Sequence, residues 1–209
     1  MKPFAFILTL TLASGACFAQ IRPSLAFSAG YSNIRLSTAA DYLHFDRDGG
    51  YIDGEFGLNL GDRRAPLFLG FGASASYHYD TEDFHYHDYY GNYYTVYDTT
   101  SSVDFYSFEA RIGVPITFSP SRRDPRGFFL FPKLGAGLLV SDYGIDTNFG
   151  TEYHTGAAFG VRPSIQAGYT WGWGAVGVEA SYMWAWGDFG NLGDRAQEAR
   201  VGAFLRFRF

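Results

Sequence analysis

The sequence predicts an all-β fold, an eight-stranded antiparallel up-and-down transmembrane β-barrel. Apolar and polar residues alternate along eight segments, and long and short connections alternate between these segments. The chain also ends on such an alternating segment, at Phe209. Because successive side chains of a strand point to opposite faces, each segment has one apolar and one polar face. A closed barrel in a membrane places the apolar faces outside and the polar faces inside.

The last strand, 197–209, shows the alternation most clearly. One face carries Ala199, Val201, Ala203, Leu205, Phe207 and Phe209, and the other carries Glu198, Arg200, Gly202, Phe204, Arg206 and Arg208. This ending resembles the closing strand of bacterial outer-membrane β-barrels, which finish on Phe with apolar residues at alternate positions before it. The resemblance implies that Leu205, Phe207 and Phe209 form an assembly signal read by the barrel-assembly machinery.

The first residues predict a secretory signal peptide. Lys2 precedes an apolar run over 4–12, and small residues follow up to Ala19. A positive start, a short apolar core and an Ala before the cut are typical of such signals. The run is too short to span a bilayer as a helix, which needs about 20 apolar residues. We therefore expect residues 1–19 to be removed and residues 20–209 to form the barrel.

A lipid anchor at Cys17 is the alternative for this end of the chain. It requires an aliphatic residue three positions earlier, and Ser14 stands there. Cleavage after Ala19 would leave a mature chain without cysteine, so its stability would not come from disulfides. A closed barrel, in which the backbone polar groups pair with each other, is one way to supply that stability.

The first four strands are expected at 22–35, 51–60, 66–79 and 103–116. Each sets apolar residues against small or polar ones, and the alternation is cleanest in the third. Their apolar faces carry Leu25, Phe27, Ala29 and Tyr31; Ile52, Phe56, Leu58 and Leu60; Leu67, Leu69, Phe71, Ala73, Ala75, Tyr77 and Tyr79; and Tyr106, Phe108, Ala110, Ile112 and Val114.

The next three strands are expected at 128–140, 157–171 and 175–186. A stretch rich in Pro and Arg, 119–127, breaks the chain before the first of them. The opposite faces are mainly Gly, Ser and charged residues, which suits a narrow lumen. The apolar faces carry Leu130, Leu134, Ala136, Leu138 and Val140; Phe159, Val161, Ile165, Ala167 and Tyr169; and Val176, Val178, Ala180, Tyr182, Trp184 and Trp186.

The connections between strands alternate in length. The long ones are 37–50, 80–102 and 141–156, and a shorter one at 187–196 lies at the same end. Outer-membrane barrels have long extracellular loops and short periplasmic turns, so these four connections are expected outside the cell.

Aromatic residues on the apolar faces sit near the strand ends. Amphipathic rings favour the headgroup level of a membrane. A soluble sandwich or a lipocalin-like barrel would also alternate, but it would explain neither these rings nor the final Phe. The outer group is Tyr31, Tyr77, Tyr79, Trp184 and Trp186, and the inner group is Trp171, Phe207 and Phe209.

Composition supports one exported barrel domain. Aromatic residues make up 20% of the chain, with Tyr 16 and Phe 21, while charged residues make up 18%. The mean hydropathy of -0.10 follows from averaging an apolar outer face with a polar inner face. A net charge of -5 argues against nucleic acid as a partner, because binding to phosphates depends on positive charge.

With this pattern, residues 20–209 resemble the small eight-stranded outer-membrane barrels of the OmpA transmembrane-domain, OmpX and Ail type. The resemblance covers the architecture and no sequence motif. It implies that the protein resides in the bacterial outer membrane, in contact with its lipids and with lipopolysaccharide.

Charged residues on the inward faces predict an interior charge network. Eight strands leave an interior just wide enough for side chains to fill, and an unpaired buried charge is costly, so opposite charges should pair. The network forms either a hydrogen-bonded plug or the lining of a narrow gated pore for ions or small solutes. Its members are Asp53, Glu55, Glu109, Arg111, Lys133, Arg162, Glu179, Glu198, Arg200, Arg206 and Arg208.

The second long connection contains a run of His, Asp and Tyr over 83–97. In an extended chain His85 and His87 share a face, so both could bind one Zn or Cu ion, with His78, Asp80, Asp83 or Asp88 completing the shell. The same run could form a Tyr-rich recognition surface for an extracellular ligand. A third interpretation is that these hairpins extend the barrel above the membrane.

A lipid-modifying enzyme is a further alternative. Deacylation needs a Ser, a His and a carboxylate in contact, and Ser76, His78 and Asp80 share the inward face of one strand. A site in the lumen would not easily admit a lipid, so we expect no enzyme and no cofactor. The leading hypothesis is a structural or surface-interaction protein whose Tyr-rich acidic loops serve envelope integrity or adhesion.

Overall fold

The computed structural model describes residues 21–37, 44–61, 66–87, 93–118, 126–147, 150–189 and 194–209. The predicted signal peptide, 1–19, lies outside these ranges. Within them, no helix has the length and the apolar character needed to cross a membrane.

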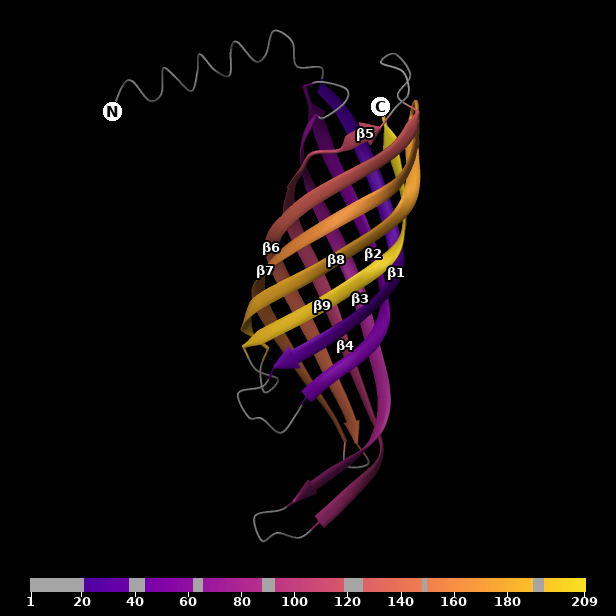
Figure 1. Ribbon diagram of the computed structural model, residues 1–209. Helices are drawn as coiled ribbons and strands as arrows, with labels where there is room; N and C mark the ends of the chain where they lie inside the picture. Colours follow the sequence, from indigo (N-terminus) through magenta and orange to yellow (C-terminus); the bar gives the residue numbers. More distant parts are fainter. Residues whose placement is uncertain are drawn as a thin grey trace, which may run out of the picture.

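Strands make up almost all of the described chain (Figure 1). They are β1 (Ile21–Ser37), β2 (His44–Leu60), β3 (Leu67–His87), β4 (Tyr93–Gly113), β5 (Ile116–Phe118), β6 (Gly127–Thr147), β7 (Gly150–Trp171), β8 (Gly174–Asp188) and β9 (Arg195–Arg208). Each pairs antiparallel with its neighbours in the order β4-β3-β2-β1-β9-β8-β7-β6-β5, and β4 also pairs with β6.

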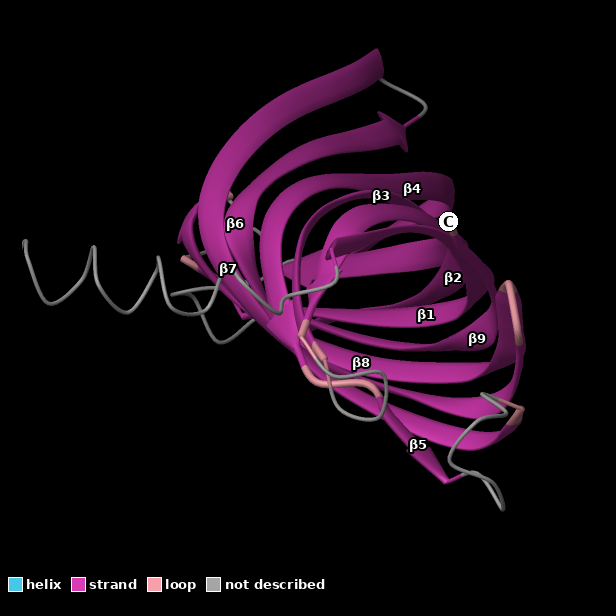
Figure 2. Ribbon diagram, turned by 90° about the horizontal axis from the view of Figure 1, so that it is seen from above, coloured by secondary structure: helices cyan, strands magenta, loops and turns pink. Residues whose placement is uncertain are grey.

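The strands of the described residues close into a barrel of eight (Figure 2). The short β5 continues β4, because both pair with β6: Gly113 lies opposite Lys133, and Ile116 lies opposite Leu130. Pro115 stands at the break, where its lack of an N–H interrupts the ladder. The predicted fold class, an eight-stranded antiparallel up-and-down barrel, is confirmed.

The first and last strands seal the barrel. Phe207 on β9 lies opposite Leu25 on β1, and the N–H of Phe209 donates to the carbonyl oxygen of Pro23 at 3.0 Å. The N–H of Arg208 donates to the carbonyl oxygen of Trp173 at 2.8 Å, which ties the end of β9 to the β7–β8 turn.

Side chains alternate between the two faces of the wall as expected. Phe108 is 64% exposed, whereas the next residue, Glu109, is 5% exposed. Large apolar side chains cover the outside of the strands, and charged ones are buried inside them. A protein in water would hide this apolar belt, so the arrangement is that of a barrel surrounded by hydrocarbon.

The predicted strand limits are wrong at the outer end. The expected long connections are largely strand: β1 and β2 pair up to Ser37 and His44, and β6 and β7 pair up to Thr147 and Gly150. In Figure 1 the β3–β4 hairpin stands well beyond the other strands, at the end opposite the C-terminus. Above a membrane both faces of a strand meet water, so the ladder continues although the apolar alternation stops.

The inward faces, expected to be mainly small or polar, also carry large apolar side chains. Two apolar clusters lie inside the barrel. The inner cluster, toward the C-terminal end, contains Phe68, Phe129, Phe131, Ala175 and Phe204. The outer cluster contains Ile34, Leu36, Val103, Phe105, Leu139, Tyr143, Ala158, Met183, Ala185, Phe189 and Ala196.

Candidate functional site

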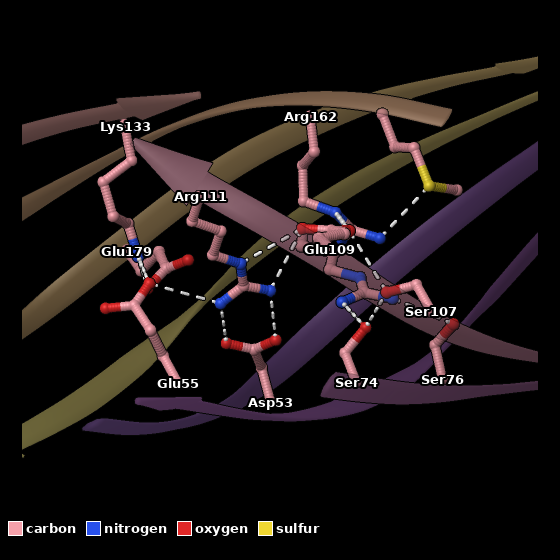
Figure 3. A network of polar contacts seen from close by, with 12 residues as sticks. Asp53, Glu55, Ser74, Ser76, Ser107, Glu109, Arg111, Lys133, Arg162 and Glu179 are labelled. Carbon is pink, nitrogen blue, oxygen red and sulfur yellow. Dashed lines mark hydrogen bonds and ion pairs between the residues drawn. The ribbon is translucent and has the colours of Figure 1, made fainter. Parts of the chain in front are cut away.

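A layer of charged side chains lies between the two apolar clusters, and Arg111 on β4 stands at its centre. Its Nη1 and Nη2 donate to the two carboxylate oxygens of Asp53 on β2, at 2.7 and 2.6 Å. Nη1 also lies 3.3 Å from Glu55 Oε2, and Nε donates to Glu109 Oε2 at 3.1 Å. One guanidinium therefore joins three carboxylates (Figure 3).

Glu55 connects the centre of the layer to the inner cluster. It accepts from Lys133 Nζ at 2.9 Å and from Arg206 Nη2 as well as from the central arginine. Lys133 also lies 3.6 Å from Glu179, which accepts a hydrogen bond from the amide of Gln166. Gln166 was not expected in the network, because an uncharged inward residue does not stand out in an alternating strand.

A second chain of ion pairs connects the centre to the opposite side of the lumen. Arg162 Nε donates to Glu109 Oε1 at 2.7 Å, and its Nη2 lies 3.3 Å from Glu198 Oε2. Glu198 in turn lies 2.8 Å from Nε of Arg200. These contacts join β4, β7 and β9 across the interior.

Serine hydroxyls complete this part of the layer. Arg200 donates to the hydroxyls of Ser74 at 2.8 Å and Ser76 at 3.4 Å. Ser74 Oγ lies 2.7 Å from Ser107 Oγ, which donates to Glu109 at 3.1 Å (Figure 3). The layer is thus one connected set of hydrogen bonds from strand to strand.

Ten of the eleven residues expected in the interior charge network are buried, and each of the ten has an oppositely charged partner. Mutual pairing offsets the cost of removing these charges from water. The loss of one partner would leave the opposite charge buried and unpaired, which is costly. These ten are Asp53, Glu55, Glu109, Arg111, Lys133, Arg162, Glu179, Glu198, Arg200 and Arg206.

Aromatic rings close the inner side of the layer. The guanidinium of Arg206 lies over Phe131 at 4.8 Å and over Phe68 at 5.4 Å from the ring centroids. Lys133 Nζ lies 5.4 Å from the centroid of Phe131, which packs edge-on against Phe68. Cation–π contact and apolar packing together fill the lumen below the ion pairs. Phe68 and Phe131 were not assigned to either face from the sequence, because the alternation was read from the aliphatic and polar residues around them.

The described hydrogen bonds of His78 are with Ser32 and Val103 rather than with Ser76. It is fully buried, with Nε2 2.9 Å from Ser32 Oγ and Nδ1 3.4 Å from the carbonyl oxygen of Val103. The hydroxyl of Ser76 accepts a hydrogen bond from Arg200. The side chain of Asp80 lies outside what the structure describes.

The candidate metal ligands lie on the protruding hairpin. The backbone of His85 pairs with Thr95, and that of His87 pairs with Tyr93. Their side chains, and Asp88 as a whole, lie outside the described part, so the metal site stays a prediction. Among the described side chains, no group of three or more His, Cys, Asp or Glu converges as a metal site would require.

Aromatic side chains meet at both rims of the apolar belt. At the outer rim Tyr77 stacks on Tyr79, with ring centroids 6.4 Å apart. At the inner rim Trp173 stacks on Phe207 at 6.0 Å and meets Trp171 edge-on at 5.5 Å. Leu205, Phe207 and Phe209 all lie on the outward side of β9, where another chain could contact them; their role as an assembly signal remains a prediction.

No protein-family model and no curated protein matches the chain. Among solved structures, similar chain paths occur in Ail, the attachment invasion locus protein of Yersinia pestis, in Neisserial surface protein A and in outer membrane protease OmpT from Escherichia coli. The identities are 14%, 14% and 11%, and the TM-scores are 0.46, 0.49 and 0.49. The alignments cover 90%, 88% and 90% of this chain and 99%, 97% and 96% of those chains. At these values the likeness says nothing of activity.

Proposed function

We propose that this chain is a bacterial outer-membrane barrel with a structural or surface-interaction role. In this proposal the signal peptide 1–19 directs export, the C-terminal strand engages the assembly machinery, and outer-membrane lipids surround the apolar belt. The barrel carries out no catalysis. It holds a strand hairpin above the lipopolysaccharide layer, where an extracellular ligand can reach it.

The observation that carries the proposal is the unequal height of the wall. Strands β3, β4, β6 and β7 have 21 or 22 residues, whereas β8 and β9 have 15 and 14, and of the long strands the β3–β4 hairpin extends farthest from the C-terminal end (Figure 1). The β3–β4 ladder continues to the pair His87 and Tyr93, far beyond the last apolar residues of the belt. One hairpin is therefore presented on a rigid support.

The edge of this hairpin suits contact with another chain. In the described ranges β2 pairs with β3 only as far as Gly49 and His78, and the ladder with β4 covers the other edge. The edge of β3 over 79–87 thus has no strand partner there. An exposed edge offers N–H and C=O groups that an extended segment can pair with.

A narrow gated pore is the second candidate, because the lumen is charged. The contacts of the layer favour a plug instead: the ion pairs are bonded from wall to wall, and an apolar cluster lies on each side of them. Conductance of purified protein in a planar bilayer separates the two. A plug gives no steady current, and a steady pore would overturn the structural assignment.

The surface role is tested by shortening the hairpin. Residues 83–97 are replaced by Asn-Gly, which closes a two-residue hairpin turn, and residues 38–43 of the β1–β2 connection are replaced in the same way as a control. Bacteria that express each variant are tested for adherence to epithelial monolayers. We expect adherence to be lost only with the first variant, while heat-modifiable gel mobility persists in both. Equal adherence of all three strains would refute the role of the hairpin.

A further inference from the structure

The inner mouth of the lumen holds a positive charge that the charged layer does not neutralise. The layer contains five acids, and the contacts described above assign all of them to five of the six bases that were expected in the charge network. The sixth base is Arg208. In the described part of the chain no carboxylate contacts Arg208, and the charges that act on it are those of Arg206 and Arg22.

The fold holds Arg208 in this position. It lies opposite Ser24 of β1, and its backbone N–H is bonded to the carbonyl oxygen of Trp173. Its side chain is half-buried, on the inward face of β9. A cation that is partly removed from water, near other arginines and without a carboxylate of its own, is costly, and a bound anion would relieve that cost.

Further hydrogen-bond donors surround the same mouth. Arg22 of β1 lies opposite Asn59 of β2. The amide of Asn59 donates to Ser24 Oγ at 3.2 Å and to the backbone carbonyl oxygen of Arg22 at 3.3 Å, so the side chains of Asn59 and Ser24 are held together beside the backbone of Arg22. Arg206 Nη1 donates to the same serine hydroxyl at 3.3 Å. Arg208 lies opposite Ser24 of this polar group in the ladder, and Arg22 lies near enough for its charge to act on Arg208.

We propose that the inner mouth binds a phosphate group through Arg208, with Arg22 as the second cation. The planar guanidinium fork donates two parallel hydrogen bonds to phosphate oxygens, which makes arginine suited to this ligand. The stacked rings of Trp173 and Phe207 lie at the same end of the barrel and mark the level of lipid headgroups. The phosphate comes either from a phospholipid of the inner leaflet or from free inorganic phosphate.

The test uses the full barrel refolded in a phosphate-free maltoside detergent. Inorganic phosphate is titrated by ³¹P NMR at constant ionic strength, and phosphatidylglycerol is titrated by native mass spectrometry. Saturable one-to-one binding of either probe is expected, and the probe that binds identifies the source. We expect Arg208→Gln to weaken binding about tenfold or more, since charge-assisted bonds to phosphate are among the stronger ones.

Two further variants keep the test decisive. Arg208→Lys retains the charge without the fork, and we expect binding about threefold to tenfold weaker. Arg195→Gln removes an exposed arginine from the opposite end of the barrel, and binding should be unchanged. If Arg208→Gln does not fold, Arg208→Lys carries the comparison. The proposal is overturned if neither probe binds saturably to the original chain. It is also overturned if the folded Arg208 variants bind the probe as tightly as the original chain does.

Discussion

Strands β3 and β4 contribute both to the charged layer in the barrel and to the hairpin above the belt, yet these two regions are stabilised differently. In the layer, Arg111 and Glu109 of β4 are bonded to side chains of other strands across the lumen. In the hairpin, the two strands pair with each other through backbone bonds beyond the belt. One region is fixed by contacts through the interior and the other by its local ladder, so substitutions should affect their stability very differently.

The largest effect is expected from Arg111→Met. This change leaves Asp53 without its bidentate partner and weakens the balance around Glu55 and Glu109. Removal of one partner from a buried ion pair costs about 3–5 kcal/mol. Urea unfolding of the barrel in lipid vesicles, followed by heat-modifiable mobility, measures the loss. Unchanged stability would mean that the charged layer does not stabilise the barrel.

A charge introduced on the outer face should reduce the free energy of unfolding slightly less than Arg111→Met does. The reduction should depend on the height of the residue along the barrel wall. Phe108 lies in the apolar belt, whereas Tyr153 of β7, 79% exposed, lies in the part of the wall beyond it. We expect Phe108→Arg to cost about 2–4 kcal/mol and Tyr153→Arg about 0–1 kcal/mol in vesicles. Equal losses of unfolding free energy in the same assay would contradict the assignment of position 108 to the apolar belt and of position 153 to the wall beyond it.

A smaller effect is expected from filling the space beside the central arginine. A Cβ at Gly72 would overlap the guanidinium of Arg111. At Gly54, on the outward face, the nearest atom to an added Cβ is the carbonyl oxygen of Ala73 at 3.9 Å. Gly72→Ala should therefore cost about 1–3 kcal/mol as overpacking, and Gly54→Ala should be nearly neutral. The reverse order would place the two glycines on the wrong faces.

The smallest effect on stability is expected from the hairpin itself. Replacement of 83–97 by Asn-Gly leaves the contacts of the layer and the belt in place, so the free energy of unfolding should change by less than about 1 kcal/mol. Failure of the variant to insert would show that the hairpin is part of the folding unit rather than a display element.

The sequence predicted which face of the barrel wall each strand residue occupies better than it predicted which side chains pack together in the lumen. Alternation assigned residues such as Phe108 and Glu109 to the correct faces, because burial on one side of a strand leaves a period of two. It did not predict that Phe68, Phe129 and Phe131 lie inside, since one or two aromatic residues on an inward face do not form a recognisable pattern within a single strand. Register across several strands brings those rings together.

The outer ends of the strands were underestimated for a related reason. The segment 80–87 has no apolar face, so periodicity could not distinguish a solvated ladder from a loop. The ion-pair partners in the lumen could not be predicted from the sequence either. The sequence contains six inward bases and five inward acids in the expected network, but only the structure places Arg111 between Asp53, Glu55 and Glu109.

The depth of labelled positions tests the central claim, a hydrocarbon-covered belt with a hairpin-bearing wall above it. A spin label is attached to a single cysteine introduced at Phe108 or at Tyr153, and its collisions with dissolved oxygen and with a water-soluble nickel chelate are measured in lipid vesicles. We predict high oxygen and low nickel accessibility at position 108, and the opposite at position 153. High nickel accessibility at position 108 in the folded protein would contradict the account.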